Sequence, residues 1–283
     1  MTTFMETPVT SGVSPERARS WLLVPATKPE AFSAAVESEV DAVILDIEDA
    51  VAPNAKPAAR DAVVAWLEAG NSAWVRVNDA STSFWADDLA ALSGLKGLAG
   101  IMLAKTESGS QVEASAARLA DGTRILALVE SAMGLEATPE IARADSTFRL
   151  AFGSGDFRRD TGMSDEPLAM AYPRSRLVVS SRAARLPGPI DGPTLTSNES
   201  ILARDSALTL SMGMTGKLCM HSEQAPTVNR ELAPTPSDVT WADDVVDALG
   251  FDGSGVKDGS DLPRLAKALK IREAAQIFGV RAG

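Results

Sequence analysis

Residues 41–51 read DAVILDIEDAV, in which the apolar residues AVIL are followed at once by the acids Asp46, Glu48 and Asp49. A short uninterrupted apolar run is typical of a strand that is buried on both faces of a parallel sheet. Acids directly after such a strand either end it in a surface loop or line a site at its carboxyl end. The pattern along the rest of the chain favours the second interpretation.

Similar apolar runs recur about eight times, and longer stretches with helical periodicity separate them. Eight strand–helix units over roughly 230 residues predict a closed (β/α)8 barrel, a TIM barrel, which typically takes about 250 residues. An open doubly wound sheet is the alternative, but no Gly-x-Gly-x-x-Gly motif follows the first strand to support its dinucleotide-binding form. The expected strands are 21–24, 42–45, 73–77, 100–103, 124–129, 147–152, 188–190 and 216–220.

Polar residues stand at the carboxyl end of most expected strands, where a barrel of this type builds its active site. Glu130 and Asp156 follow neighbouring strands, and Arg76 lies near the end of another. Two carboxylates beside an arginine would bind Mg²⁺ and a carboxylate substrate. The other polar residues at strand ends are Asp46, Glu48, Asp49, Asn78, Lys105 and His221.

Each of these residues also has a purely structural interpretation. A guanidinium inside an apolar strand needs an anionic partner, so Arg76 fits a buried ion pair as well as a ligand contact. Glu130 could cap a helix, and Asp156 could be one more turn residue after two glycines. We expect Lys105 to pair with the surrounding acids and not to form a Schiff base, and His221 to be a hydrogen-bonding structural residue.

The composition excludes several classes of function. Thirty-eight acidic residues against 27 basic ones give a net charge of −11, which argues against binding to nucleic acid. One histidine and one cysteine cannot build the usual structural zinc site, so a bound metal should be a hard cation such as Mg²⁺. No Gly-x-Ser-x-Gly motif supports a serine hydrolase.

The strand–helix alternation stops after His221, where the Pro-rich segment APTPSD at 233–238 precedes two further helical patterns. The sequence therefore predicts a flexible lead over 1–19, a barrel over 20–231 and a C-terminal helical extension, or lid, over 232–283. The first residues lack the apolar core of a signal peptide, and no apolar run is long enough to span a bilayer. A single cysteine also excludes an intrachain disulfide, so we expect a cytoplasmic protein with no membrane partner.

Several segments, taken in order, resemble the citrate lyase β-subunit-like proteins of the HpcH/HpaI aldolase superfamily. They are LDIEDAV followed by KPAAR, then WVRVN, IMLAK, LVESAMGL, FGSGD and KLCMHSEQAPTVN. The resemblance runs from about Trp21 to Asn229, and LDIEDAV with its following K-x-x-A-R is the most specific part. It implies a (β/α)8 barrel, often trimeric, that makes or breaks a carbon–carbon bond between an acyl-CoA enolate and an α-keto acid.

The resemblance also assigns roles to residues. It makes Glu130 and Asp156 the Mg²⁺ ligands and Arg76 the contact to the substrate. In related CoA lyases a C-terminal Asp reaches the neighbouring subunit's site, and Asp261 in DLP corresponds to it, with Asp258 as a rival because the residues before DLP differ.

The sequence departs from the family pattern at three points. L-A-K replaces L-P-K, H-S-E-Q replaces H-P-x-Q, and Gly155 stands where many relatives carry an acid before the metal-binding Asp. Pyruvate-type aldolases of the superfamily carry a histidine base near Asp46 and Glu48. Its absence here points to the CoA-lyase branch, in which these two acids would hold metal-bound waters and position Arg76 or Lys105.

The expected function is Mg²⁺-dependent cleavage or formation of a β-hydroxyacyl-CoA thioester such as citryl-, malyl- or citramalyl-CoA, in a homo-oligomer. Asp261 would transfer the proton at the acetyl-CoA enolate. Two alternatives stay open, an aldolase acting on a free hydroxy-keto acid and a non-catalytic ligand-binding subunit. The cations expected either at the CoA phosphates or as solvated surface charges are Lys28, Lys56 and Arg60.

Overall fold

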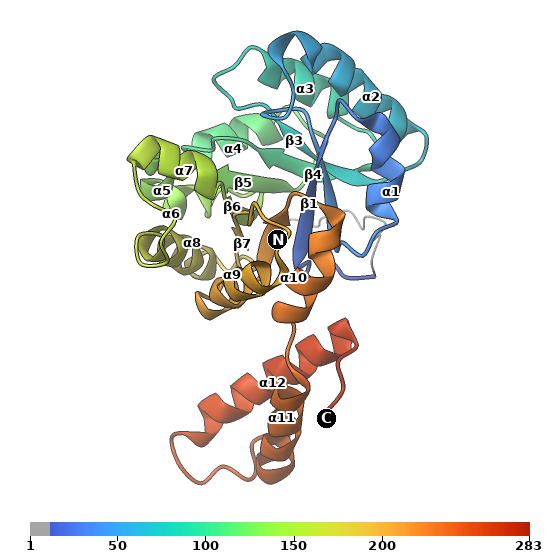
Figure 1. Ribbon diagram of the computed structural model, residues 1–283. Coiled ribbons are helices and arrows are strands. Elements are labelled where there is room, and N and C mark those ends of the chain that lie inside the picture. Colours follow the sequence, from blue (N-terminus) through green and yellow to red (C-terminus); the bar gives the residue numbers. More distant parts are fainter. Residues whose placement is uncertain (1–11) are drawn as a thin grey trace. The chain divides into compact units, whose positions relative to one another are not determined.

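Eight parallel strands follow one another in chain order around a closed barrel (Figure 1). The computed structural model describes residues 12–283, and it confirms the predicted (β/α)8 architecture. The part of the expected flexible lead up to residue 11 lies outside the described residues. The strands are β1 (Ser20–Pro25), β2 (Ala42–Asp46), β3 (Ala73–Val77), β4 (Leu98–Leu103), β5 (Ile125–Val129), β6 (Thr147–Phe152), β7 (Ile190–Asp191) and β8 (Gly216–Cys219).

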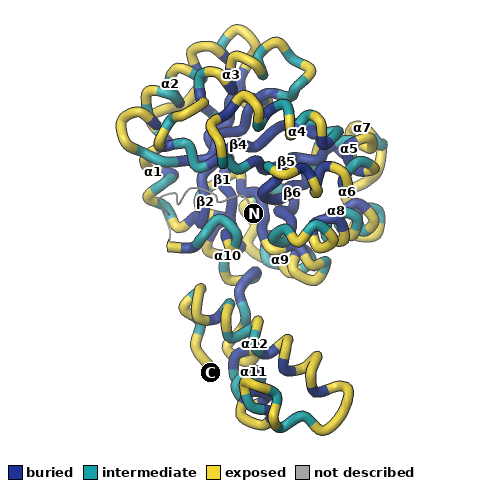
Figure 2. Tube along the Cα trace, turned by 180° about the vertical axis from the view of Figure 1, so that it is seen from behind, coloured by how far each residue is buried: buried dark blue, intermediate teal, exposed yellow. Residues whose placement is uncertain are grey.

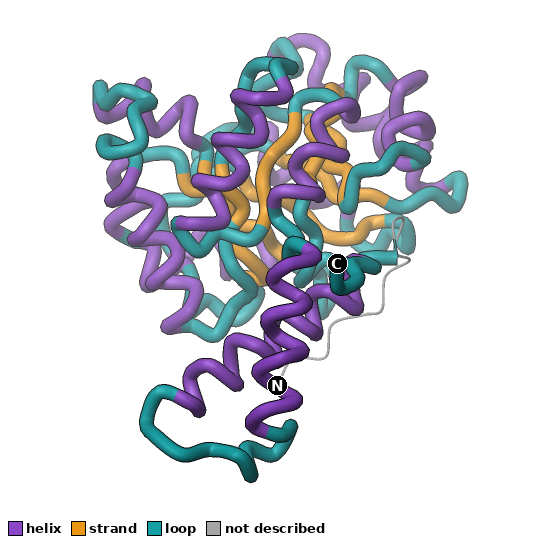
Figure 3. The backbone as a smooth tube through the Cα atoms, turned by 60° about the horizontal axis from the view of Figure 1, so that its bottom comes forward, coloured by secondary structure: helices purple, strands orange, loops and turns teal. Residues whose placement is uncertain are grey.

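Helices on the outside of the barrel cover the strands, as Figure 3 shows. The strands are buried almost throughout, while the outward faces of the helices are exposed (Figure 2). The helices are α1 (Phe32–Val36), α2 (Lys56–Glu68), α3 (Phe84–Leu92), α4 (Gly109–Ala116), α5 (Ala132–Glu136), α6 (Thr138–Ile141), α7 (Ser154–Thr161), α8 (Ala171–Ala183), α9 (Glu199–Ser211) and α10 (Ala225–Glu231). Short 3-10 helices lie at Pro29–Ala31, Pro53–Ala55 and Ser222–Gln224.

The shortest strand, β7, differs from the sequence prediction of a strand over 188–190. It pairs with β6 and β8 only through Ile190 and Asp191. The strand begins at Ile190, two residues later than predicted, and Pro189 directly before it has no N–H to donate to a ladder.

Aromatic rings fill the barrel interior near the beginnings of the strands. The indole of Trp21 packs edge-on against that of Trp74, with the ring centroids 5.4 Å apart. The Trp74 ring stacks on Phe148 with a centroid distance of 5.5 Å. Because alternate residues of a strand share a face, the residue two positions after Trp74 also points inward. Arg76 is therefore an interior residue, one layer closer to the carboxyl ends of the strands.

The segment before β1 is bonded to the barrel from residue 15 onward. The guanidinium of Arg149, on β6, donates to the carbonyl oxygens of Pro15 at 3.3 Å and Ala18 at 3.0 Å and to the Thr215 hydroxyl at 2.8 Å. The Arg149 side chain is fully buried and lies over the Trp21 ring. These bonds close the amino-terminal end of the barrel.

The described residues form two compact units, which divide between Val228 and Asn229. The first unit ends inside α10, whereas the sequence pattern put the end of the barrel at residue 231. No helix among residues 12–283 is long and apolar enough to cross a membrane.

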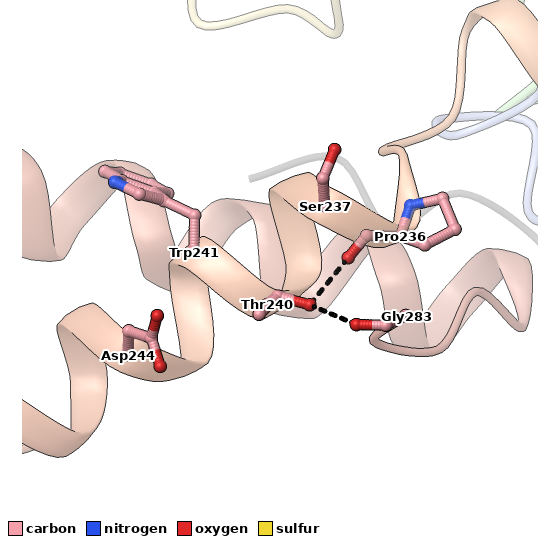
Figure 4. Close-up of a pocket in the computed structure, with 6 residues that line it drawn as sticks. All are labelled: Pro236, Ser237, Thr240, Trp241, Asp244 and Gly283. Carbon is pink, nitrogen blue, oxygen red and sulfur yellow. Dashed lines mark hydrogen bonds between the residues drawn. The ribbon is translucent and has the colours of Figure 1, made fainter.

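The second unit is a pair of helices, α11 (Pro236–Leu249) and α12 (Asp261–Phe278). A pocket opens beside the start of α11, where the Thr240 hydroxyl donates to the carbonyl oxygens of Pro236 at 3.1 Å and Gly283 at 3.2 Å (Figure 4). The apolar residues that join the two helices are Ala242, Val245, Val246, Leu249, Leu265 and Ala268.

Candidate active site

An ion pair joins the ends of β2 and β3 inside the barrel. Asp46 and Arg76 are register partners in the ladder between these strands. The guanidinium donates from Nε to Asp46 Oδ1 at 2.8 Å and from Nη2 to Asp46 Oδ2 at 2.6 Å. Burial alone would lower the pKa of Arg76, but the two hydrogen bonds and the charge of Asp46 outweigh burial and raise it. The arginine is therefore a fixed positive charge in the barrel interior.

Glu48 lies beside this pair on the loop after β2. Its Oε2 is 3.3 Å from Arg76 Nη1 and accepts the backbone N–H of Asp49 at 2.8 Å. Burial raises the pKa of the Glu48 carboxyl to about 7, against the opposing charge of Arg76. A pKa near neutral pH is favourable for a group that transfers a proton, so Glu48 is a candidate for this role.

Glu130 follows β5 and is held by the two neighbouring strands. The backbone N–H of Lys105, just past β4, donates to Glu130 Oε1 at 2.8 Å. On the other side, Gly153 follows β6, and a Cβ at that position would collide with the Glu130 carboxylate. Burial raises the pKa of Glu130 to about 8, while the Lys105 N–H and Arg76 act in the opposite direction.

Asp156 lies in the first turn of α7, so the sequence GSGD opens a helix and is not a turn. Its Oδ1 pairs with Arg159 at 2.8 Å. Its Oδ2 is buried and has no hydrogen-bond partner. The negative charge of Asp156 also contributes to the raised pKa of Glu130.

The donor set of Glu130 and Asp156 fits Mg²⁺. A buried carboxylate oxygen without a partner is costly unless a ligand or water satisfies it, and a divalent cation would also stabilise the ionised form of Glu130. Among residues 12–283, no cluster of three or more His, Cys, Asp and Glu side chains could hold a metal. Two carboxylates suffice for Mg²⁺, because this ion usually keeps several waters and takes further oxygens from its substrate.

Two of the three cations that the sequence suggested for CoA are engaged inside the fold. Lys56 donates to the carbonyl oxygens of Ile47 at 3.1 Å and Glu48 at 2.7 Å, so it braces the loop after β2. Arg60 pairs with the buried carboxylate of Asp88 at 3.0 Å. Lys28 is exposed on the loop that follows β1, at the carboxyl end of the barrel.

Asp261 belongs to the second unit and is 6% exposed. Its Oδ2 accepts the backbone N–H groups of Lys257 at 2.9 Å and Asp258 at 3.3 Å, and its Oδ1 pairs with Arg264 at 3.2 Å. Asp258 accepts hydrogen bonds from Ser260. In this structure both acids hold the loop before α12.

The sequence analysis did not predict two features of the site. Lys105 adopts a left-handed backbone conformation with φ of 45°, which no local pattern signals. Gly153 makes room for Glu130, and its only sequence signal is a glycine directly after an apolar strand. His221 stands at the N-cap of the 3-10 helix Ser222–Gln224, where its backbone N–H donates to Gln224 Oε1 at 3.3 Å.

Several proteins are similar to this chain over most of its length. The citrate lyase subunit beta-like protein of Mycobacterium tuberculosis is 34% identical over 232 residues, which cover 78% of this chain and 81% of the relative. Human mitochondrial citramalyl-CoA lyase is 30% identical over 257 residues, 82% of this chain and 75% of the enzyme. The crystal structure of CitE from M. tuberculosis with magnesium, acetoacetate and coenzyme A matches with a TM-score of 0.77 and 30% identity, over 92% of this chain and 99% of that one.

Two family models match the two parts of the chain. The HpcH/HpaI aldolase C-terminal domain matches residues 237–279. The HpcH/HpaI aldolase/citrate lyase model matches residues 19–222, which is most of the barrel and agrees with the resemblance of the strand-end motifs. The chain therefore belongs to the HpcH/HpaI aldolase/citrate lyase family.

Proposed function

We propose that this protein is a Mg²⁺-dependent carbon–carbon lyase that cleaves or forms a β-hydroxyacyl-CoA thioester of the citryl, malyl or citramalyl type. The observation that carries the proposal is the pair of acids at the carboxyl end of the barrel. Glu130 has a pKa raised to about 8, and Asp156 keeps a buried oxygen without a partner. Both features favour a bound cation, and CitE from M. tuberculosis binds magnesium with acetoacetate and coenzyme A.

Glu130 and Asp156 would hold the ion, which would act as a Lewis acid on the keto acid's oxygens. Arg76 has N–H groups left over after its bonds to Asp46 and Glu48, and these would donate to an oxygen that gains negative charge during the reaction. Asp46 fixes the plane of the guanidinium through two hydrogen bonds, so the donors would be oriented before the substrate arrives.

Two carboxylates are candidates for the proton transfer at the acyl-CoA carbon. Asp261 is assigned by the family resemblance, and in this role it would have to leave its bonds to Lys257 and Asp258. Glu48 lies within the barrel site and titrates near pH 7. We propose Asp261 as the proton-transferring group, with Glu48 as its rival.

Lys28 is the only one of the three suggested cations without an internal role in the described residues. We propose that it contacts the CoA phosphates, while Lys56 braces the loop on which Glu48 lies and Arg60 joins α2 to Asp88 on α3. The substrates would be an acyl-CoA and an α-keto acid, and we expect the protein to act as a homo-oligomer, with a trimer favoured.

A product assay tests the proposal. The full-length protein would be incubated with citryl-, malyl- and citramalyl-CoA and, separately, with free 4-hydroxy-2-keto acids, with Mg²⁺ or with EDTA. We expect a keto acid and an acyl-CoA in equal amounts from one thioester, only with Mg²⁺. Turnover of a free hydroxy-keto acid instead would establish the aldolase alternative. Mg²⁺-dependent ligand binding without turnover of any substrate would establish a binding subunit.

A further inference from the structure

The chain makes an unusual turn directly after β4. Lys105 has φ of 45°, in the left-handed region that a Cβ atom disfavours. Two hydrogen bonds of the next residue fix this turn, from the Thr106 N–H to the Leu128 carbonyl at 2.9 Å and from the Thr106 hydroxyl to the Leu103 carbonyl at 2.8 Å. A disfavoured conformation that its surroundings enforce is a reason to look for a function.

Because hydrogen bonds of Thr106 anchor the chain that follows, the positive φ of Lys105 decides where its backbone N–H lies relative to that chain. The Lys105 N–H donates to Glu130 Oε1 at 2.8 Å. Glu130 is only 4% exposed, so this hydrogen bond to a carboxylate lies in a buried environment where such bonds are strong. It fixes one oxygen of the carboxylate and leaves the other to point elsewhere.

The ammonium group of the same residue contributes much less. Its Nζ lies 3.5 Å from Glu48 Oε1, and the Lys105 side chain is 41% exposed. Water screens such a pair, and exposed ion pairs of this kind add little to stability. The backbone of residue 105 therefore has a stronger hold on the site than its side chain.

We propose that Lys105 is a positioning residue whose left-handed backbone, and not its ammonium group, holds the Glu130 carboxylate in the orientation that binds the metal. This inference rests on the proposed Mg²⁺ site. It predicts that substitutions at 105 rank by the ease with which they adopt positive φ. Glycine adopts it freely, alanine less readily, and β-branched valine least of all.

The test compares Lys105→Gly with Lys105→Val in the full-length protein, because both lose the ammonium group and differ mainly in the cost of positive φ. Mg²⁺ affinity would be measured by calorimetry and metal-free stability by thermal unfolding. We expect Lys105→Gly to bind Mg²⁺ within about threefold of the wild type and to melt about 2 °C higher. Lys105→Val should bind at least about tenfold more weakly, as when a metal ligand loses a hydrogen-bond partner.

Arg185 provides a matched control. It is the only other non-glycine residue with positive φ among residues 12–283, at 61°, and it precedes β7 at the opposite end of the barrel. Arg185→Val should lower the melting temperature and leave Mg²⁺ affinity unchanged. If Lys105→Val does not fold, Lys105→Ala takes its place and must bind more weakly than Lys105→Gly.

Equal Mg²⁺ affinities of the glycine and valine variants would overturn the inference, whether both match the wild type or both are weak. Equal weakness would assign the role to the ammonium group. A wild-type protein without measurable Mg²⁺ affinity would instead refute the metal site, and this inference with it. Wild-type binding combined with equal variants would refute only the role of the backbone.

Discussion

Three carboxylates are buried within one small region, and each is accommodated differently. Asp46 accepts two hydrogen bonds from the guanidinium of Arg76. For Glu48 and Glu130, the nearby positive charges and hydrogen bonds do not outweigh the effect of burial. Burial therefore raises the pKa of Glu48 to about 7 and that of Glu130 to about 8. The metal-free site therefore contains two acids whose pKa values lie well above that of an ordinary glutamate.

This arrangement predicts a specific pH dependence of stability. Because the folded-state pKa values of Glu48 and Glu130 lie above the ordinary value of 4.5, the folded protein binds more protons than the unfolded chain between about pH 4.5 and 8. The metal-free protein should therefore lose stability as the pH rises through this window. Mg²⁺ must displace a proton, so its affinity should increase up to about tenfold per pH unit and level off above about pH 8.

Urea unfolding and Mg²⁺ calorimetry between pH 5 and 9 would check both slopes. The control is Glu130→Gln, which should flatten the upper part of the stability curve and lose most of the Mg²⁺ affinity. Metal-free stability that stays constant over the whole window would contradict the raised pKa values.

A second prediction at this scale concerns Arg76→Lys. Lysine keeps the charge but cannot make the paired bonds to Asp46, and it lacks the planar donors that would face the substrate. We expect kcat/KM to fall by about 10²- to 10³-fold, as when a fixed donor to a developing charge is removed. Arg60→Lys is the matched control, because Arg60 makes one hydrogen bond to Asp88, and it should change kcat/KM less than about threefold. Near-normal turnover in Arg76→Lys would make Arg76 a structural residue.

At the scale of the elements, the sequence predicted the strands and the residues at their ends, because both depend on the local pattern of apolar and polar residues. Strand ends project to one face of a parallel barrel, so Arg76, Glu130 and Asp156 could be found from their positions alone. The sequence suggested Asp46 and Glu48 as acids that position Arg76 or Lys105, but it could not choose among these pairs. Asp46 lies 30 residues from Arg76 and becomes its partner through the register of β2 and β3. The direction of the Lys105 N–H could not be predicted either, because it depends on Thr106 bonding to β5.

The two-residue strand β7 has too few ladder bonds to hold its place by itself. Asp191 at its end is fully buried and accepts hydrogen bonds from Arg174 on α8 at 3.0 Å and from Thr209 on α9 at 2.6 Å. Its carboxylate also lies 3.9 Å from the buried ammonium of Lys217 on β8. Burial would raise the pKa of Asp191, but Lys217 and Arg174 outweigh it and lower the pKa.

Asp191→Asn should therefore destabilise the protein by about 3–5 kcal/mol, because it leaves two buried cations without their counterion. Equilibrium unfolding in urea would measure the loss. Asp165→Asn serves as the control, since Asp165 is exposed and lies 3.4 Å from Arg158, and it should cost about 0–1 kcal/mol. Equal losses in the two variants would show that the buried cluster is not what holds β7.

At the scale of the whole molecule, the proposed role of Asp261 makes activity a property of the oligomer. If each site combines the barrel of one subunit with the Asp261 of a neighbour, mixing inactive Asp261→Asn with inactive Glu130→Gln subunits should restore activity. Random assembly of equal amounts would give about a quarter of the wild-type rate, because each site draws the two parts independently.

The control mixes Glu130→Gln with Asp156→Asn, which damage the same barrel and should show no recovery. Native mass spectrometry would verify that mixed oligomers form in both experiments. Absence of recovery in verified mixtures of Asp261→Asn and Glu130→Gln would remove Asp261 from the reaction and favour Glu48.

The bonds of Arg149 to the segment before β1 also constrain the order of events during synthesis. Pro15 and Arg149 are 134 residues apart in the chain. At a translation rate of about 5–20 residues per second, the amino-terminal segment leaves the ribosome roughly 7–27 s before its partner. During that interval the segment has no Arg149 to bind, so a nascent chain stalled before residue 149 should be cut by protease near Pro15, and one that extends past β8 should resist.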